Sequence, residues 1–315
     1  MNKFTTSLVA FCCIVAMGCS AQAQRIASIT STKSITSSNG FFPQVNYQGT
    51  QVVYSETEGR TLYLYDIESG QRTTISNDDY PGFEARFSKE GKVYYVTMKS
   101  NSDHLVFRSV HEYDPATGQD RVVLSGQHGA VHAIQGTHGM AAVGETKQWT
   151  EANAGTFCWT LGARLYVVKN GRKRTFQPVK GCVGYLWSSI SPDGKKVVME
   201  AAGKGLYVVD AESGRVLWHT STQYIMPCWY DNDYLIVQTH GYKILLMKAD
   251  GSEQMTLASG SVTMPAVSGK YITYTTKGGS VTVMTIALRG EEGYDDGSRP
   301  VVVETTEPEI ITEEQ

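Results

Sequence analysis

The stretch SPDGKKVVMEAAGKGLYVVDAESGRVL, from Ser191 to Leu217, contains two short apolar runs between turns that carry glycine. The runs Lys196–Glu200 and Gly205–Asp210 are rich in Val, Leu and Tyr, which favour β-strands, and neither is long enough for a helix. Pro192-Asp193-Gly194 predicts a tight turn, because Pro presets φ for the first corner and Gly accepts a positive φ. Glu212-Ser213-Gly214 predicts a second turn. The stretch therefore predicts consecutive short strands joined by tight turns.

The same pattern recurs along the chain. Similar segments carry a first turn marker at six positions: Gly49, Gly91, Gly139, Gly194, Asn232 and Gly269. The spacings between these markers are 42, 48, 55, 38 and 37 residues. A second set of glycines keeps step with the first: Gly70, Gly118, Gly171, Gly214 and Gly251. A period near 40 residues with four short strands per unit is typical of a β-propeller, whereas an ordinary β-sandwich does not require two turn markers in register.

Each first marker follows a segment that we interpret as the innermost strand of a blade. These segments are Phe42–Val45, Phe83–Phe87, Val131–Ile134, Tyr185–Ile190, Ile225–Cys228 and Met264–Val267. The sequence thus predicts an all-β, six-bladed β-propeller of four-stranded antiparallel blades over residues 24–305. The expected blades are residues 40–79, 80–128, 129–181, 182–221, 222–260 and 261–305, with a long insertion at 145–161 in the third. The strand that closes the ring would come from Arg25–Thr30 or from Pro300–Glu304.

One blade resembles a known family of repeats. The segment Trp187-Ser188-Ser189-Ile190-Ser191-Pro192-Asp193-Gly194, followed by a strand that ends at Asp210 and a turn at Gly214, is similar to the TolB-type repeat of six-bladed, WD40-like propellers. The resemblance is looser in the other blades and covers about residues 41–288. It implies a fold and not an activity, since one fold serves many functions. We expect neither the additional α/β domain of TolB nor the hydrolase domain of prolyl-oligopeptidase relatives, and no Gly-x-Ser-x-Gly motif occurs.

The first residues have the pattern of an export signal. Lys3 precedes an apolar run at Leu8–Met17, and Ala21-Gln22-Ala23 offers the small-x-small pattern that a signal peptidase recognises. This predicts a signal peptide over residues 1–23 and export to the periplasm or cell envelope of a bacterium. Alternatively, Gly18-Cys19 resembles a lipoprotein site, which would anchor the protein to the membrane through lipid on Cys19. Membrane contact is expected only in that second case.

Cysteines and motifs give little indication of bound cofactors. Outside the signal segment the chain contains Cys158, Cys182 and Cys228, of which Cys158 and Cys182 are the preferred pair for a disulfide. The sequence contains no Cys-x-x-Cys, Walker loop, His-Glu-x-x-His or EF-hand loop. We therefore expect neither a metal nor another cofactor.

Charge is distributed unevenly along the chain, whose net charge is −3. Residues 291–315 contain nine acids and one arginine, and residues 306–315 are interpreted as a mobile acidic tail. Residues 24–290 carry a net charge of +4, which is too weak to predict a nucleic-acid partner.

Several side chains are candidates for binding near the axis or on the insertion. His132 opens an inner strand, and Glu84 and Arg86 lie on another, where a structural ion pair is the simpler interpretation. Trp149 and Trp159 lie in the long insertion, and Trp187 lies on an inner strand, so their rings are candidate surfaces for a glycan or peptide.

Two classes of function are compatible with these features. The first is a non-enzymatic binding or assembly module of the bacterial cell envelope, which contacts a protein or a glycan through one face of the propeller. The alternative is a small propeller enzyme, a lyase or glycosidase, that acts on oligosaccharide with His132, Glu84 and Arg86 near the axis.

Overall fold

The repeated stretch folds as its sequence predicts. The computed structural model describes residues 25–35, 40–56, 60–78, 81 and 85–296. In it, residues 185–220 form β16 (Tyr185–Ile190), β17 (Lys196–Ala201), β18 (Gly205–Asp210) and β19 (Val216–Thr220). The four strands pair antiparallel, each with the next, in a single sheet. This sheet is one blade of a ring.

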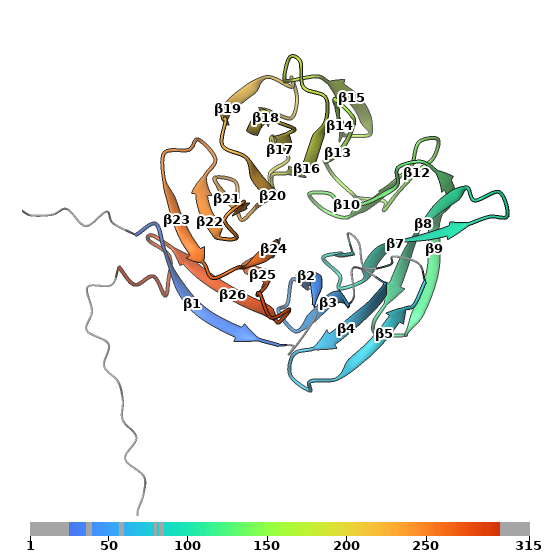
Figure 1. Cartoon of the computed structure of the whole chain (residues 1–315), viewed down its shortest axis with the longest axis horizontal. Helices are drawn as coiled ribbons and strands as arrows, with labels where there is room; N and C mark the ends of the chain where they lie inside the picture. The colour runs from blue at the N-terminus through green and yellow to red at the C-terminus, as the bar shows by residue number, and fades with distance from the viewer. Residues whose placement is uncertain (1–24, 36–39, 57–59, 79–80, 82–84, 297–315) are drawn as a thin grey trace, which may run out of the picture.

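Seven such sheets stand around a central axis (Figure 1), and we number them as blades 1 to 7 in ring order. Blade 1 contains β2 (Phe41–Val45), β3 (Gln51–Glu56), β4 (Thr61–Asp66) and β5 (Arg72–Ser76); blade 2 contains β6 (Arg86–Phe87), β7 (Val93–Ser100), β8 (Val106–Asp114) and β9 (Gln119–His128). Blade 3 contains β10 (His132–Gln135), β11 (Met140–Val143) and β12 (Gln148–Thr150); blade 4 contains β13 (Phe157–Leu161), β14 (Arg164–Lys169) and β15 (Arg172–Phe176). Blade 5 contains β16–β19, and blade 6 contains β20 (Tyr224–Trp229), β21 (Tyr234–Thr239), β22 (Ile244–Lys248) and β23 (Gln254–Ala258). Blade 7 contains β24 (Thr263–Ser268), β25 (Tyr271–Thr275), β26 (Val281–Leu288) and β1 (Ala27–Ser34).

The all-β propeller is confirmed, but the predicted count of six blades is wrong. Residues 129–181, expected to form one blade with a long insertion, form two sheets of three strands each, β10–β12 and β13–β15. Together these two blades have six strands, where two regular blades would have eight. In chain order, the two missing strands would lie between β12 and β13: the fourth strand of blade 3 and the strand that would precede β13 in blade 4. β13 takes the innermost place that this absent strand would have occupied.

The direction of β13 explains how two strands can be absent at this point of the ring. The Tyr185 amide, at the start of β16, donates a hydrogen bond to the Gly162 carbonyl just after the end of β13, at 3.0 Å. Thr160 of β13 also donates to the Tyr185 carbonyl, at 3.1 Å. At the other end, Gly194 after β16 lies against Thr156, which precedes β13. The innermost strand of blade 4 is therefore antiparallel to that of blade 5, and the chain enters blade 4 from the opposite side of the disc.

The first strand of the described chain closes the ring. β1 pairs antiparallel with β26 from Ala27–Leu288 to Ser34–Thr282, and so forms the outermost strand of blade 7. Of the two segments considered for closure, the N-terminal one takes this place. Residues 300–304 lie outside the described residues, as do the predicted signal peptide at 1–23 and the acidic tail at 306–315.

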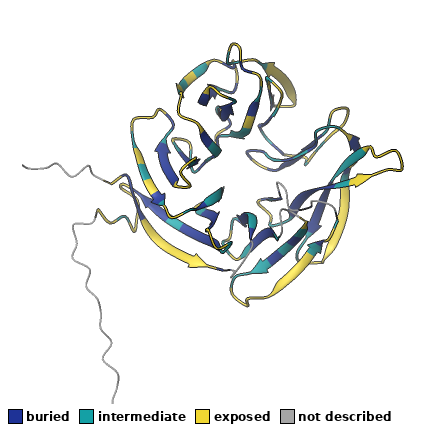
Figure 2. Ribbon diagram, in the orientation of Figure 1, coloured by how far each residue is buried: buried dark blue, intermediate teal, exposed yellow. Residues whose placement is uncertain are grey.

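The hydrophobic core lies between neighbouring blades, and Figure 2 shows buried residues along the inner strands and exposed residues along the outer ones. Two glycines set how closely blades stack. An added Cβ at Gly251 would lie 2.4 Å from the Trp218 ring of the preceding blade, and one at Gly214 would lie 2.5 Å from the Phe176 ring. Glycine is therefore required at both turns so that an aromatic ring can cover them.

The turns between third and fourth strands repeat one local motif. All five glycines of the second marker set have a positive φ, between 70° and 73°. An aspartate at the end of the preceding strand accepts hydrogen bonds from the turn: Asp210 from the amide and hydroxyl of Ser213, and Asp66 from those of Ser69. These bonds hold the pKa of Asp66 and Asp210 below the ordinary value. Within the described ranges every regular element is a strand, and no helix has the length and hydropathy of a membrane span.

Candidate binding face

The two faces of the disc differ in the connections they carry. One face, which we call the loop face, carries the links between blades and the loops between second and third strands. The other, the turn face, carries the turns between first and second and between third and fourth strands. In blade 4, the reversed direction of β13 places the β13–β14 loop on the loop face and the β14–β15 turn on the turn face.

Four innermost strands share a bulge near the loop face. Phe42, Trp187, Met226 and Met264 have φ values between 50° and 57°, and in each strand the pairing register shifts at this point. A positive φ is uncommon for bulky residues and persists only where the surrounding structure holds it. The four side chains are half-buried, and the Met264 sulfur accepts the Phe42 amide at 3.3 Å. The loop-face end of the axis therefore has an apolar rim.

The turn-face end of the axis is polar by comparison. Gln135, at the end of β10, donates a hydrogen bond to the Tyr47 hydroxyl in the turn after β2, and so bridges blades 1 and 3. Burial, with a smaller contribution from the Glu90 charge, raises the pKa of Tyr47 to about 12. Lys89 adds a second bridge, since its ammonium donates to the Thr137 carbonyl at 2.7 Å.

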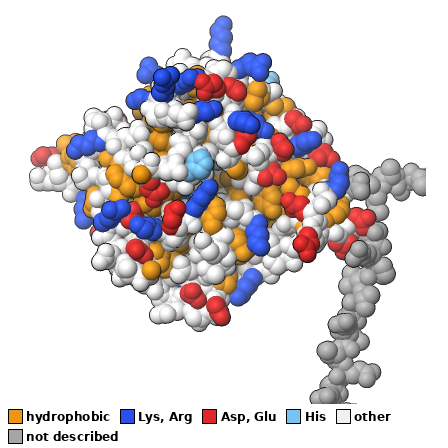
Figure 3. Space-filling view, turned by 180° about the vertical axis from the view of Figure 1, so that it is seen from behind, with side chains coloured by type: hydrophobic (Ala, Val, Ile, Leu, Met, Phe, Trp, Pro, Cys, Tyr) orange, Lys and Arg blue, Asp and Glu red, His pale blue; other side chains and the backbone are white. Residues whose placement is uncertain are grey.

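Charge separates the two faces most clearly over blades 4 to 6. The loop-face segments 162–163, 177–184, 202–204, 221–223, 240–243 and 259–262 contain no Asp or Glu. They contain Lys180, Lys204 and Lys243, and Arg164 follows directly after the first segment; all four side chains are exposed. The turn-face segments 170–171, 191–195, 211–215, 230–233 and 249–253 contain six acids and two cations. Figure 3 shows one face of the disc, on which Lys and Arg side chains gather in the upper part of the view with Asp and Glu side chains among them.

Exposed apolar side chains lie on the same part of the loop face. Leu161, Val183, Leu186 and Tyr242 are 44%, 84%, 47% and 56% exposed, respectively. Leu161 and Leu186 are close neighbours, because Gly162 and Tyr185 are hydrogen-bonded to each other. Tyr242 also has a positive φ of 56° and accepts the Val262 amide through its carbonyl. We call the four apolar residues, with Arg164, Lys180, Lys204 and Lys243, the loop-face patch.

An open depression adjoins the patch on blade 6. Its volume is about 440 Å³, and it is lined by Thr239, Gly241, Lys243, Leu245, Gln254, Met255 and Thr256. Its lining combines the Lys243 stem, two apolar side chains and polar side chains of strand β23. The depression thus extends the patch towards the outer edge of the disc.

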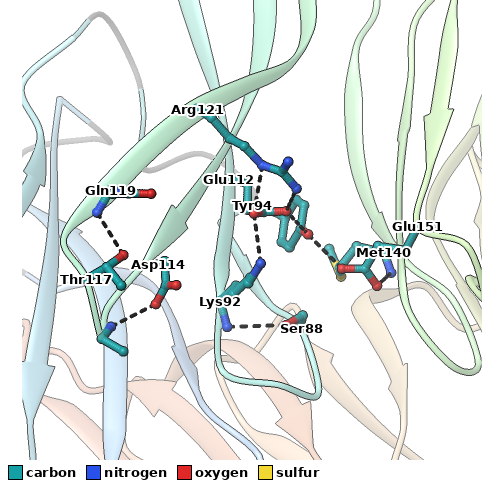
Figure 4. A network of polar contacts seen from close by, with 11 residues as sticks. Ser88, Lys92, Tyr94, Glu112, Asp114, Thr117, Gln119, Arg121, Met140 and Glu151 are labelled. Atoms are coloured by element: carbon teal, nitrogen blue, oxygen red, sulfur yellow. Dashed lines mark hydrogen bonds and ion pairs between the residues drawn. The ribbon is translucent and has the colours of Figure 1, made fainter.

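Blades 2 and 3 share a network of polar contacts around the buried side chains of Glu112 and Tyr94 (Figure 4). Glu112, only 5% exposed, accepts two hydrogen bonds from Arg121, one from Lys92 and one from the Tyr94 hydroxyl. Burial alone would raise the pKa of Glu112, but the bonds from Arg121, Tyr94 and Lys92 outweigh it and lower the pKa to about 2. Both carboxylate oxygens of Glu112 accept hydrogen bonds from cations or from the Tyr94 hydroxyl, so this cluster joins strands and blades rather than presenting a reactive group.

The predicted residues near the axis are only partly brought together. Arg86 lies on β6, the inner strand of blade 2. Burial raises the pKa of Cys228 on β20 to about 12, and the nearby Arg86 charge opposes this rise. His132 is the first residue of β10 and is half-buried. Glu84 lies outside the described residues, so its pairing with Arg86 stays a prediction. In the described part of the chain, no group of three His, Cys, Asp or Glu side chains could hold a metal ion.

The three predicted tryptophans differ in their surroundings. Trp159 is only 8% exposed, and its ring stacks on Tyr166 at a centroid distance of 5.0 Å. Trp149 lies 5.8 Å from the Tyr94 ring and packs between blades 2 and 3. These two rings therefore pack between blades instead of lining an exposed surface. Trp187 lies on the apolar rim, where a binding role stays a prediction.

The cysteines of the described chain are free thiols. Cys158 and Cys182 belong to one buried cluster between blades 4 and 5, and the Cys182 thiol donates to the Gly184 carbonyl at 2.9 Å. Burial raises the pKa of Cys158 to about 12. No bond joins the two sulfurs in this structure, and the disulfide stays a prediction that thiol titration in denaturant would test.

The cations of the patch were missed by the sequence reasoning, although one signal was available. Residues 152–192 contain six cations and no acid over 41 positions. That run marks blade 4 and the link to blade 5. Lys204 and Lys243 come from blades 5 and 6, and the stacking of these consecutive blades on blade 4 brings all of these cations to the same face.

Comparisons with known proteins support the fold. Solved propellers match over most of their length: a chain of the mitotic checkpoint complex with a TM-score of 0.61, 9% identity and coverage of 90% of this chain and 99% of that chain, and the β-propeller domain of Cps50 (Swd1) from Myceliophteria thermophila with a TM-score of 0.58, 9% identity and coverage of 81% and 99%. The chain is a β-propeller. TolB from Acinetobacter baumannii matches with a TM-score of 0.51 and 18% identity over 74% of this chain, which spans 58% of the TolB chain. No family model and no curated protein matches the sequence.

These likenesses concern the fold alone, since all three identities are below 20%. The TolB-type resemblance in the sequence is thus supported at the level of a propeller, and the six blades it implies are not found. What this propeller binds has to be argued from its own surface.

Proposed function

We propose that this propeller is a non-enzymatic binding module that holds a partner protein against the loop-face patch. The observation that carries the proposal is the contrast between the connecting segments of the two faces over blades 4 to 6. The loop-face segments contain three cations and no acid, with Arg164 directly beside them and four exposed apolar side chains. The turn-face segments contain six acids and two cations, with Lys169, Arg172, Lys196 and Lys248 directly beside them. Exposed apolar side chains that form a group often mark a site of interaction with another protein.

The composition of the patch favours a protein over a glycan. Sugar faces stack on exposed aromatic rings, and Trp149 and Trp159 are packed between blades, which leaves Tyr242 as the exposed ring of the patch. Leu161, Val183 and Leu186 instead offer anchors for apolar side chains of a partner, surrounded by cations that would select an acidic surface. We place this activity in the bacterial cell envelope, on the basis of the export signal in the sequence.

Site-directed cross-linking tests the proposal. A photoreactive amino acid in place of Val183, the most exposed apolar side chain, should cross-link a defined partner in envelope extracts. The same amino acid in place of Lys195, exposed on the turn face, is the control and should not capture that partner. Capture should be lost when Lys180, Lys204 and Lys243 are replaced by Glu. It should be kept when the turn-face residues Lys195, Arg215 and Lys270 are replaced by Glu.

Both triple variants change the net charge equally, so a general electrostatic effect would act on both alike. Circular dichroism and thermal unfolding would establish that each variant is folded. Equal capture from the two faces, or equal loss in the two triple variants, would contradict the proposal.

A further inference from the structure

We infer that the acidic C-terminal segment, residues 297–315, docks on the loop-face patch of its own chain. The inference concerns the occupant of the surface used in the proposed function, and its test does not need the partner of that function.

The last described residues fix where this segment starts. The Tyr294 hydroxyl donates to the Arg25 carbonyl at 2.5 Å, and the Asp295 amide donates to the Ser28 hydroxyl at 3.0 Å. Arg25 and Ser28 lie at the beginning of β1, the outermost strand of blade 7. The segment therefore starts at the outer rim of blade 7, beside blade 6, whose inner strand β20 contacts β24.

The chemistry of the segment complements the patch. Residues 297–315 contain five glutamates and one arginine, together with two apolar groups, Val301–Val303 and Ile310–Ile311. The patch offers four cations without an acid and four exposed apolar side chains. The segment thus supplies acidic and apolar side chains, and the patch supplies cationic and apolar ones. Apolar burial and charge pairing would therefore act together.

The segment is long enough to reach the patch. Nineteen residues span at most about 65 Å when extended, whereas a six-residue strand is about 20 Å long. The segment can therefore pass from the rim of blade 7 over the thickness of the disc to the loops of blades 6 and 5. Because it is tethered, its local concentration at the patch would be on the order of millimolar.

The turn face is a poor alternative site for this segment. Over blades 4 to 6 it contains Asp193, Glu212, Asp231, Asp233, Asp250 and Glu253. Five of these acids form ion pairs: Asp193 with Lys195, Glu212 with Lys169 and Arg174, Asp233 with Lys196, Asp250 with Lys248, and Glu253 with Arg289. The turn-face cations beside these acids are therefore already engaged, whereas within the described residues the patch cations form no ion pair, so the patch is the better site for an acidic segment. Occupation of the patch by the segment would instead compete with an acidic partner and lower the apparent affinity of the proposed function.

The experiment uses a labelled peptide of residues 297–315 and the full-length chain in which Glu304, Glu307, Glu309, Glu313 and Glu314 are replaced by Gln. Fluorescence anisotropy at low salt should show that the peptide binds this neutralised chain at least tenfold more tightly than the wild-type chain, whose own segment already occupies the patch. Binding should be lost when Lys180, Lys204 and Lys243 are also replaced by Glu, and kept with the turn-face control Lys195→Glu, Arg215→Glu and Lys270→Glu.

A second measurement locates the segment in the wild-type chain. With the photoreactive amino acid at position 183, dilute protein should give an intramolecular cross-link to residues 297–315, found by mass spectrometry. A cross-link only between two chains, equal peptide affinity for wild-type and neutralised chains, or loss of binding in the turn-face control would each overturn the inference. A peptide that binds while no partner is captured would support the inference and reject the proposed function, and the reverse result would do the opposite.

Discussion

The Tyr94 hydroxyl lies 2.7 Å from the Glu151 carboxylate, and this contact joins β7 of blade 2 to the segment that follows β12 in blade 3. The same hydroxyl lies 2.5 Å from Glu112 on its own blade, so its one hydrogen serves two carboxylates. The other oxygen of Glu151 accepts the Met140 amide at 2.8 Å. A single side chain therefore connects the ion-paired centre of blade 2 with the second strand of blade 3, next to the place where the chain omits two strands.

We expect Tyr94→Phe to destabilise the fold by about 1–3 kcal/mol, because buried carboxylate groups lose their hydroxyl partner while the ring packing is kept. Urea unfolding followed by circular dichroism would measure the change. Tyr113→Phe is the matched control: Tyr113 is buried on the opposite side of the same sheet, and no hydrogen bond of its hydroxyl is found within the described ranges. Equal losses of stability in the two variants would show that the blade 2 to blade 3 contact contributes nothing.

Glu112 predicts a specific pH dependence of stability. Its pKa in the folded protein is about 2, below the ordinary value of 4.5, so folding favours the ionised form. This contribution is complete above pH 4.5 and is lost as the pH falls towards 2, and a shift of this size corresponds to about 3 kcal/mol. Glu112→Gln should therefore flatten the fall in unfolding free energy between pH 4.5 and 2.

The measurement is a series of urea unfolding curves at several pH values. The turn aspartates Asp66 and Asp210 also have lowered pKa values and contribute to the acid dependence, so the difference between wild type and variant is what isolates Glu112. Glu68→Gln, at an exposed position in the β4–β5 turn, serves as the control for the removal of one carboxylate. An unchanged slope in Glu112→Gln would contradict the prediction.

The local structure was predictable because it is set by neighbours in sequence. Gly70, Gly118 and Gly214 indicate turns, since few other residues adopt the positive φ these turns require, and each has φ near 70° in the structure. The strands between them follow from runs of Val, Leu and Tyr. Strand positions, antiparallel order and the propeller itself could therefore be derived from the sequence.

The number of blades could not be derived in the same way. A count of first strands gives six, because β13 is the innermost strand of blade 4 but starts from the turn face and lacks the link that precedes other inner strands. Its position depends on contacts with Tyr185 in blade 5, which is far from the repeat signal of β13 itself. For a similar reason the patch was not foreseen, since Lys180, Lys204 and Lys243 lie on the same face only because blades 4, 5 and 6 stack on one another.

The predicted signal peptide gives a prediction that does not depend on the described residues. We expect the intact mass of the protein recovered from the cell envelope to correspond to a chain that starts at Gln24, because the signal pattern ends at Ala21-Gln22-Ala23. Cyclisation of Gln24 would lower this mass by one ammonia. A mass that corresponds to Cys19 with added acyl chains would instead establish a lipid anchor.

The contact between Gly251 and Trp218 predicts a large effect from a small substitution. At Gly251 φ is 73°, and an added Cβ would lie 2.4 Å from the Trp218 ring. Gly118 has φ of 70° in the equivalent turn of blade 2, but an added Cβ there meets nothing within 4 Å. Gly118→Ala should therefore cost about 1 kcal/mol for backbone conformation alone, and Gly251→Ala about 2–4 kcal/mol, because overpacking is added.

Chemical denaturation of the single variants and of a double variant would separate the two contributions. In a Trp218→Ala background the ring is absent, so Gly251→Ala should cost only the backbone part, about the same 1 kcal/mol as Gly118→Ala. This coupling would show that the ring of one blade requires the glycine of the next, and that the spacing between blades 5 and 6 is set at this turn. If Gly251→Ala cost the same with and without Trp218, the stacking of the ring on the glycine would not determine how closely these blades approach.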